Sequence, residues 1–298
     1  MENRDVLQAK SFINNEWVGH STTNILVVKN KFDQSPLATV SYADSSEVQF
    51  AIANSVQAFQ SYSKLSAAER RDYLLKIREG LFQERDKFIN LIVSEGGKPV
   101  NYATQEVERS LLILQSAADE AIRVGGEVVP MDFGLGKGKS AYTKNYPIGP
   151  ILAISPFNFP LNLAMHKIAP ALAVGCPVIL KPSPYTPLTA LALASLCKRV
   201  GLPAGVLNVV VCQNEEASLM LKDERLKMLS FTGSAEVGWK LKSEAGKKKV
   251  VLELGGNAAV IVDRTANLDE AAKAIAMGAY NYACLLYTSP SPRDAQLS

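Results

Sequence analysis

The stretch that decides the fold is residues 151–187, ILAISPFNFPLNLAMHKIAPALAVGCPVILKPSPYTP. An apolar run at Ile151–Ser155 leads through a proline-rich turn into a helical stretch at 161–174, and a second apolar run follows at Val178–Lys181. The alternation continues, with strands expected at 206–211, 227–231, 250–254 and 258–262 and helices at 188–200, 215–221 and 235–245. Strands that alternate with helices predict an α/β fold, in which a Rossmann-like parallel sheet is flanked by helices.

The residues before this stretch predict three helices. Two capping-box spacings precede apolar residues at helical spacing, namely Asp44 with Glu47 and Ser66 with Glu69. We expect a first helix with Phe59 on its buried face and a second that continues to Gly96–Gly97. The apolar face of the third helix should end at Ile122.

Two other segments indicate hairpins. FINNEWV, residues 12–18, places Asn14 and Asn15 between apolar flanks, which is typical of a tight β-turn. Residues 128–149 are rich in glycine and lysine, and we expect them to form an exposed β-hairpin arm outside the core.

Asn158 and Lys181 lie where two of the expected strands end, and ligands bind at the carboxyl ends of the strands in such sheets. Pro156 and Pro160 fix the turn around Asn158, whose side-chain amide could donate hydrogen bonds to an oxyanion. Lys181 could reach a nucleotide ribose or phosphate. Taken singly, an ordinary turn asparagine and a solvated surface lysine are the alternatives.

A third stretch, SFTGSAEVGWKL at 230–241, has a GxxxxG spacing and not the GxGxxG dinucleotide fingerprint. Gly233 and Ser234 open a helix directly after a strand, and Gly238 lies in its first turn. Such a turn presents backbone N–H groups and the positive end of a helix dipole to a pyrophosphate. A tight turn without a ligand is the alternative.

Glu253 is an acid within an apolar strand, in VVLELGGNAAVIV at 250–262. Burial there would raise its pKa toward the range that a general base needs. Gly255 and Gly256 follow it and permit close approach of a ligand or another backbone. A buried structural salt bridge is the alternative for Glu253.

Together, the motifs SPFNFP, KPSPYTP, FTGSAEVG and LELGGNAA resemble the aldehyde dehydrogenase superfamily, in which they occur in this order. The resemblance covers residues 12–283. It implies that Asn158 is the oxyanion-hole amide, that Glu253 is the general base and that Lys167, in HKIAP, is a further residue of the catalytic site. It also implies an NAD or NADP cofactor held by Ile154, Ser155, Pro156, Phe157, Lys181, Ser183, Pro184, Phe231, Thr232, Gly233, Ser234, Val237, Gly238, Leu254 and Gly255.

The reaction that the resemblance implies is NAD(P)-dependent oxidation of an aldehyde to a carboxylic acid through a cysteine thiohemiacetal and hydride transfer. After GAYNYA, residues 278–283, the family continues with G-Q-x-C, which would place the nucleophile at Tyr287. This chain instead reads CLLYTSPSPRDAQLS. Cys284 lies three residues early, and the other cysteines, Cys176, Cys197 and Cys212, have no such motif. We therefore expect a truncated chain that lacks the nucleophile and is inactive, or alternatively a non-catalytic NAD(P)-binding or regulatory module.

The same resemblance implies a domain organisation. Residues 1–127 would be the N-terminal helical part of the cofactor-binding domain, 128–149 an oligomerisation arm, 150–254 the dinucleotide-binding domain, 255–283 the start of a catalytic domain, and 284–298 a non-native tail. An arm of this type implies a homodimer or homotetramer.

Details of the motifs also suggest a subgroup and a cofactor preference. They are most similar to the branch with lactaldehyde, non-phosphorylating glyceraldehyde-3-phosphate and phosphonoacetaldehyde dehydrogenases. After KPS the family often has an acid that binds the ribose 2′-hydroxyl, but here the residue is Pro184. Its absence removes a reason to exclude NADP.

Composition excludes several other classes of protein. The chain has 32 Lys and Arg against 29 Asp and Glu, which is too balanced for a nucleic-acid partner. Four cysteines without CxxC spacing indicate neither a disulfide framework nor a metal site, and they fit a reducing compartment. Since no long apolar run or leader is evident, we expect a cytoplasmic protein without a membrane partner.

Overall fold

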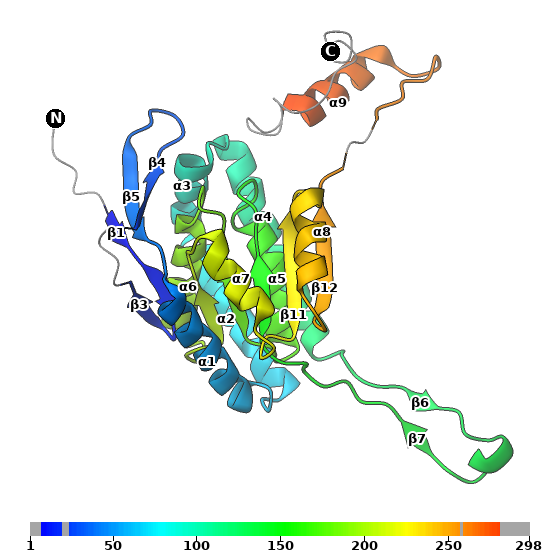
Figure 1. Ribbon diagram of the computed structural model, residues 1–298. Coiled ribbons are helices and arrows are strands. Elements are labelled where there is room, and N and C mark those ends of the chain that lie inside the picture. The colour runs from blue at the N-terminus through cyan, green and yellow to red at the C-terminus, as the bar shows by residue number, and fades with distance from the viewer. Residues whose placement is uncertain (1–6, 20–23, 257–258, 281–298) are drawn as a thin grey trace.

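The computed structural model describes residues 7–19, 24–256 and 259–280 (Figure 1). The strands are β1 (Leu7–Ala9), β2 (Ser11–Ile13), β3 (Glu16–Val18), β4 (Ile25–Lys29), β5 (Pro36–Ser41), β6 (Val128–Val129), β7 (Ala141–Tyr142), β8 (Ile151–Ile154), β9 (Val178–Lys181), β10 (Leu207–Val209), β11 (Met228–Gly233) and β12 (Lys249–Leu254). The helices are α1 (Ser45–Tyr62), α2 (Ala67–Gln83), α3 (Arg85–Gly96), α4 (Val100–Ala121), α5 (Asn162–Ala173), α6 (Leu188–Arg199), α7 (Asn214–Lys222), α8 (Ala235–Glu244) and α9 (Leu268–Tyr280). None of these described helices has the length and apolarity needed to cross a membrane.

The main sheet has seven strands in the order β12-β11-β8-β9-β10-β2-β3. Its first five strands are parallel, which confirms the predicted fold class, while β2 and β3 extend the sheet as antiparallel strands. The strand order reverses between β8 and β11. In doubly wound sheets this reversal opens a crevice at the carboxyl ends of the strands, and ligands bind there.

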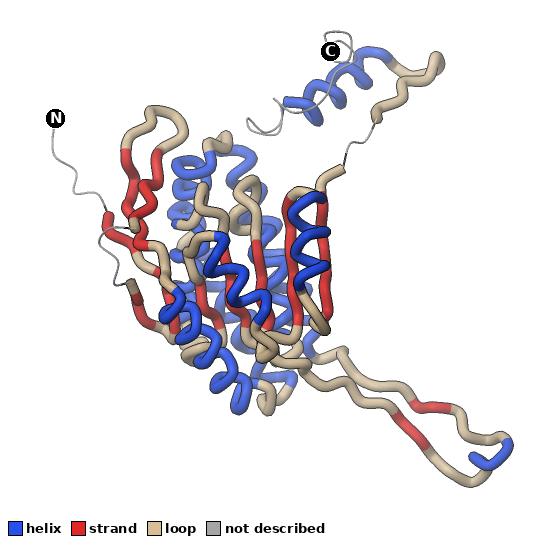
Figure 2. The backbone as a smooth tube through the Cα atoms, in the orientation of Figure 1, coloured by secondary structure: helices blue, strands red, loops and turns tan. Residues whose placement is uncertain are grey.

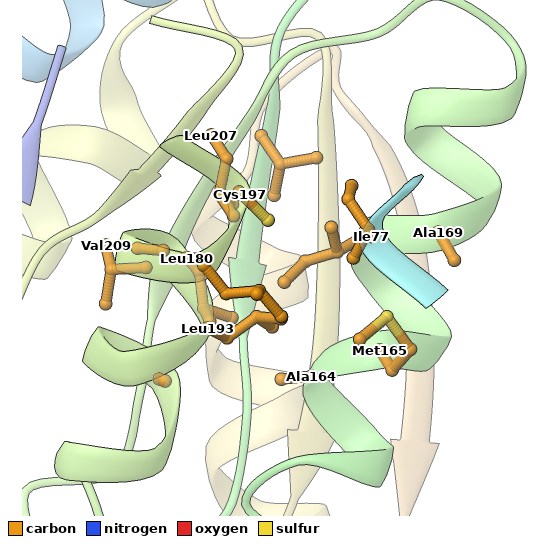
Figure 3. Packing of buried hydrophobic residues seen from close by; sticks show 14 of the residues in the cluster. Ile77, Ala164, Met165, Ala169, Leu180, Leu193, Cys197, Leu207 and Val209 are labelled. Atoms are coloured by element: carbon orange, nitrogen blue, oxygen red, sulfur yellow. The ribbon is translucent and has the colours of Figure 1, made fainter. Parts of the chain in front are cut away.

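Each face of the sheet is covered by its own apolar core. On one face, α5 and α6 pack on the strands beneath α2 and α4, and Figure 3 shows Ile77, Met165, Leu180 and Leu193 in this core. On the other face, side chains of α1 and α7, such as Ile52 and Met220, pack with strand residues near α8. Because side chains alternate along a strand, neighbouring residues of β11 and β12 face different layers.

The predicted capping boxes are both present, at Asp44 and at Ser66. The helix that begins after Ser66 does not continue to Gly96, however. It ends at Gln83, and α3 begins at Arg85, which redirects the chain so that α3 packs against both α4 and α6. Gly97, at φ +68°, ends α3 in the left-handed conformation expected of a C-terminal glycine.

Two apolar residues are less buried than the helical pattern predicts. Ile122 is 56% exposed because α4 ends at Ala121 and Ile122 lies where the chain leaves the core. Phe59 is half-buried, and the C-terminal part of the buried face of α1 consists of Ala58 and Tyr62.

Both predicted hairpins are confirmed. β2 pairs with β3 through Asn14 and Asn15, which have φ values of +55° and +63°, as a tight turn of this kind requires. β6 pairs with β7 to form the arm, which projects from the body of the molecule in Figure 2. Val128 and Leu135 on the arm are 85% and 95% exposed.

The strand predicted at 258–262 is wrong for its described part, because residues 259–262 form no strand. β12 is the edge of the sheet among the described residues, and residues 259–262 do not pair with it. Ile261 is 91% exposed, and Leu268 on α9 is 70% exposed.

The predicted tail, 284–298, lies outside the described residues. The domain boundaries remain predictions, although β2 and β3 show that the first 127 residues contribute strands to the main sheet.

We expect Gly205→Ala to destabilise the protein by about 2–3 kcal/mol, since it combines backbone strain with a clash. Gly205 has φ +76°, and an added Cβ would lie 2.7 Å from the backbone oxygen of Asn54 on α1. Gly201→Ala is the matched control: its φ is +87°, but nothing lies within 4 Å of the added Cβ, so it should cost about 1 kcal/mol. Urea unfolding of both variants measures the difference, and equal losses would contradict the clash.

Candidate active site

A groove of about 740 Å³ opens between α5 and the carboxyl-terminal halves of β11 and β12. Its lining consists of Pro156, Phe157, Asn158, Leu163, His166, Lys167, Ser230, Thr232, Gly233, Ser234, Val251, Glu253, Leu254 and Gly255. The three predicted catalytic residues are all among them, although they lie up to 95 positions apart in the sequence (253 − 158). The groove lies at the reversal of strand order, where the sheet topology predicts a ligand.

Asn158 is half-buried in the turn between β8 and α5. Its side-chain oxygen accepts a hydrogen bond from the N–H of Phe159 at 3.1 Å. Because the oxygen end is held by the backbone, the NH₂ end of the amide is left to donate in another direction. This orientation suits a donor to a developing negative charge.

Lys167 lies on α5 and is 7% exposed. Its ammonium donates hydrogen bonds to the hydroxyls of Thr232 at 2.7 Å and Ser230 at 3.3 Å, both on β11. Burial lowers the pKa of Lys167 to about 8, although the negative charge of Glu253 acts in the opposite direction. Its amine can therefore gain or lose a proton near neutral pH.

Glu253 lies in the groove, but its predicted burial is wrong for the described part of the chain. Its side chain is exposed because β12 is an edge strand and no described residue covers that side. Thr232 is its partner in the parallel register between β11 and β12, so Glu253 lies on the same face as the hydroxyls that bind Lys167.

Seven predicted cofactor residues line the groove itself: Pro156, Phe157, Thr232, Gly233, Ser234, Leu254 and Gly255. Others lie on the opposite face of the sheet or next to α8. Ile154 and Phe231 contribute to the core on that face. Ser234 caps α8, its hydroxyl oxygen accepting from the N–H of Val237 at 3.4 Å. Val237 is 45% exposed on α8 and does not line the groove.

The glycines of the GxxxxG spacing are required by packing. A Cβ on Gly233 would lie 2.6 Å from the ring of Phe231, and one on Gly238 would lie 2.3 Å from the side chain of Leu254. Both distances are shorter than real Cβ contacts, so a larger residue would displace the Phe231 ring or the Leu254 side chain. These glycines let the start of α8 lie close to the strand ends.

The remaining predicted cofactor residues follow β8 and β9. Ile154 is opposite Lys181 in the parallel register, so Ser155 and Ser183 follow adjacent strand ends. Lys181 is 7% exposed, which rules out the alternative of a solvated surface lysine. Ser183 and Pro184 are half-buried in the loop before α6.

Sequence reasoning missed four residues that line the groove: Leu163, His166, Ser230 and Val251. Leu163 and His166 lie four and one positions before Lys167, so helical spacing from Lys167 would have found Leu163. Burial lowers the pKa of His166, and the charges of Arg109 and Lys167 lower it further while Glu253 raises it. Arg109 is exposed on α4.

The three described cysteines are unsuited to nucleophilic attack. Cys176, Cys197 and Cys212 are free and buried, and none lines the groove. Burial raises the pKa of Cys197 and of Cys212 to about 12, so the thiolate is scarce at neutral pH. Cys284 and Tyr287 lie outside the described residues.

The fold and the groove define a doubly wound α/β protein with a candidate catalytic site at its switch point. The chain belongs to the aldehyde dehydrogenase family, whose sequence profile matches residues 17–284. It is 39% identical over 280 residues to 3-sulfolactaldehyde dehydrogenase of Priestia aryabhattai, covering 93% of this chain and 58% of that protein.

Solved structures show the same likeness. Aldehyde dehydrogenase 21 of Physcomitrella patens, solved with the reaction product succinate, superposes with a TM-score of 0.87 at 37% identity, covering 92% of this chain and 58% of that one. An NADP-dependent enzyme of E. coli superposes with a TM-score of 0.88 at 33% identity, covering 94% and 58%. The chain therefore spans somewhat more than half the length of these relatives. The proposed lactaldehyde-type branch remains a prediction.

Proposed function

We propose that this chain supplies the cofactor-binding part and three catalytic side chains of an NAD(P)-dependent aldehyde dehydrogenase, which oxidises an aldehyde to a carboxylic acid. The observation that carries the proposal is that seven predicted cofactor residues line the same groove as the three predicted catalytic residues, while others lie on the opposite face of the same sheet edge. Asn158, Lys167 and Glu253 share a groove on one face. Ile154 and Phe231, two of the predicted cofactor residues, lie on the other.

The residues at the start of α8 fit a dinucleotide. Gly233 and Gly238 leave no side chain between the helix start and the strand ends. Ser234 at the start of α8 is exposed, and its hydroxyl accepts from the N–H of Val237. The bound nicotinamide would accept the hydride in the reaction. Lys181 and Ser183 would hold the ribose end of the cofactor.

On the groove side, the NH₂ group of Asn158 would donate to the aldehyde oxygen as negative charge develops there. Hydride transfer from the thiohemiacetal would leave a thioester on the catalytic cysteine. Glu253 would remove a proton from the water that hydrolyses this thioester. Lys167, bound to Thr232 and Ser230, would hold its amine in the same groove as Glu253.

We also propose that the chain by itself does not oxidise aldehydes, because none of its described cysteines can reach the groove as a thiolate. The purified chain should bind NADH, with enhanced cofactor fluorescence, but should reduce no NAD or NADP when aldehyde is added. A fusion of residues 1–283 to the C-terminal part of the Priestia enzyme should gain turnover.

Failure of the chain and of the fusion to bind either cofactor would refute the proposed function. Cofactor binding by both without turnover in the fusion would favour a non-catalytic binding module. Aldehyde oxidation by the chain alone that Cys284→Ala abolishes would show that the nucleophile is present after all.

For the substrate, we propose an aldehyde with a negatively charged group at its far end. His166 lines the groove, and Arg109 is close enough to lower the pKa of His166. The relatives act on 3-sulfolactaldehyde or bind succinate, which both carry such a group. In the fusion, kcat/KM for succinate semialdehyde should exceed that for uncharged butanal by about tenfold or more; equal values would contradict the proposal.

We expect Pro184→Glu to weaken NADP binding about tenfold or more relative to NAD binding, since a carboxylate there would repel the 2′-phosphate. Titration of the chain with NADH and NADPH measures both dissociation constants. Tyr185→Glu adds the same charge one residue later, on a side chain that is 62% exposed, and should change the ratio less. A parent chain that already discriminates strongly in favour of NAD would contradict this role of Pro184.

The arm gives a basis for assembly. Val128, Leu135 and Tyr142 expose apolar surface on it, and we propose that it exchanges between subunits of a cytoplasmic homodimer or homotetramer. Sedimentation of the fusion should give the mass of an oligomer, and deletion of residues 127–143 should reduce that mass.

A further inference from the structure

Two buried glutamates hold the first turns of helices that belong to a distant part of the sequence. Glu106 on α4 accepts the N–H groups of Leu161 and Asn162, at 3.0 and 3.1 Å, through one carboxylate oxygen. Glu95 on α3 accepts the N–H groups of Leu188 and Thr189, at 2.8 and 2.7 Å, and the hydroxyl of Thr189. The two glutamates are 1% and 0% exposed.

Neither α5 nor α6 caps its own N-terminus. The residues at the cap positions are Leu161 and Pro187, and neither makes a side-chain hydrogen bond to its helix. The first N–H groups of a helix have no partner within the helix, and burial without one is costly. A carboxylate meets this need well, because it accepts several hydrogen bonds and lies at the positive end of the helix dipole.

Lys98 connects Glu106 to the turn that carries Asn158. The second oxygen of Glu106 forms an ion pair with the Lys98 ammonium, and Lys98 is 2% exposed. The same ammonium lies 3.7 Å from the centre of the Phe159 ring. Glu106 and Lys98 therefore contact the chain on both sides of Pro160, directly after Asn158.

We propose that Glu106, together with Lys98, is a positioning residue for the oxyanion donor Asn158, and that Glu95 is the corresponding positioning residue for the cofactor loop with Ser183 and Pro184. The two act through the start of α5 and the start of α6, respectively. The roles given to the two loops rest on the proposed function. The positions of the loops, and the contacts that hold them, do not depend on it.

The test measures the responses of the two loops independently of each other. The chain is labelled with ¹⁵N-asparagine so that the side-chain amide of Asn158 can be followed by NMR, and backbone amide exchange is measured by mass spectrometry. Binding of NADH to the same chain is titrated by fluorescence. All measurements are made at pH 8, because burial raises the pKa of Glu95 to about 7 and its carboxylate must be ionised.

In Glu106→Gln the Asn158 amide signal should shift or broaden, and exchange at residues 161–162 should rise about tenfold or more. Exchange at 188–189 and the dissociation constant for NADH should change less than about twofold. In Glu95→Gln the pattern should be reversed, with faster exchange at 188–189, NADH binding weakened about threefold or more, and an unmoved Asn158 signal.

If Glu106→Gln leaves an unpaired ammonium that prevents folding, the double variant Glu106→Gln/Lys98→Met removes that charge and keeps one acceptor oxygen. Equal effects of Glu95 and Glu106 variants on both loops, or no effect on either, would overturn the proposal. A chain that shows the two separate exchange patterns but binds no NADH would uphold the positioning role and refute the proposed function instead.

Discussion

Asn158→Ala in the active fusion should lower kcat by about 100- to 1,000-fold, which is the usual cost of one oxyanion-hole donor. The amide is present only to meet charge that develops in the transition state, and its oxygen end is already held by the N–H of Phe159. The dissociation constant for NADH should therefore change less than about twofold. Steady-state kinetics with one aldehyde and a binding titration measure both quantities.

Asn101→Ala is the matched control for this prediction. Asn101 is exposed on α4 and does not line the groove, so its replacement should leave kcat within about twofold. If Asn158→Ala reduces kcat by less than tenfold, the backbone of the turn alone stabilises the oxyanion. A comparable loss in both kcat and NADH binding would assign Asn158 to the structure of the turn.

The elements that could be predicted from the sequence are those fixed by nearby residues. The capping boxes at Asp44 and Ser66, the Asn14–Asn15 turn and the five parallel strands depend on patterns within a few positions. The expectations that fail depend on what packs against a segment. The burial of Glu253 and a strand at 258–262 would each require a further element beside the edge strand β12. The described residues contain no such element, and the periodicity of the sequence does not reveal that.

In the candidate site, too, features fixed by nearby residues could be predicted and contacts between distant segments could not. The turns that carry Asn158 and Ser234 follow from proline and glycine positions and from the strands before them. The contacts that support the site could not be predicted, because each joins segments far apart in the sequence. Lys167 binds hydroxyls 63 and 65 residues away, and Glu106 holds an N–H group 55 residues away. Such pairs become visible only when the sheet order and the helix packing are known.

Lys167→Met should increase the stability of the chain at pH 7 by about 2–3 kcal/mol, while it lowers turnover in the fusion. Burial moves the pKa of this lysine from 10.5 to about 8 in the folded chain, and that change corresponds to about 3 kcal/mol. Loss of the hydrogen bonds to Thr232 and Ser230 offsets part of the gain. A methionine fills similar space without a charge, so the substitution exchanges function for stability.

The stability that the Lys167→Met variant gains should depend on pH, because the pKa of Lys167 differs between the folded and unfolded chain. Because the folded pKa is lowered, the neutral amine is the form that the fold favours, and its contribution to stability is present above about pH 10.5 and lost as pH falls through about 8. The advantage of the methionine variant should thus be full at pH 7, smaller at pH 9.5 and absent above 10.5. Urea unfolding at these pH values measures it, with Lys240→Met on the exposed face of α8 as the control, expected within about 0.5 kcal/mol of the parent. A destabilised Lys167→Met chain at pH 7, or a gain that does not change with pH, would show that the lysine is stabilised by its two hydroxyl partners more than it is penalised by burial.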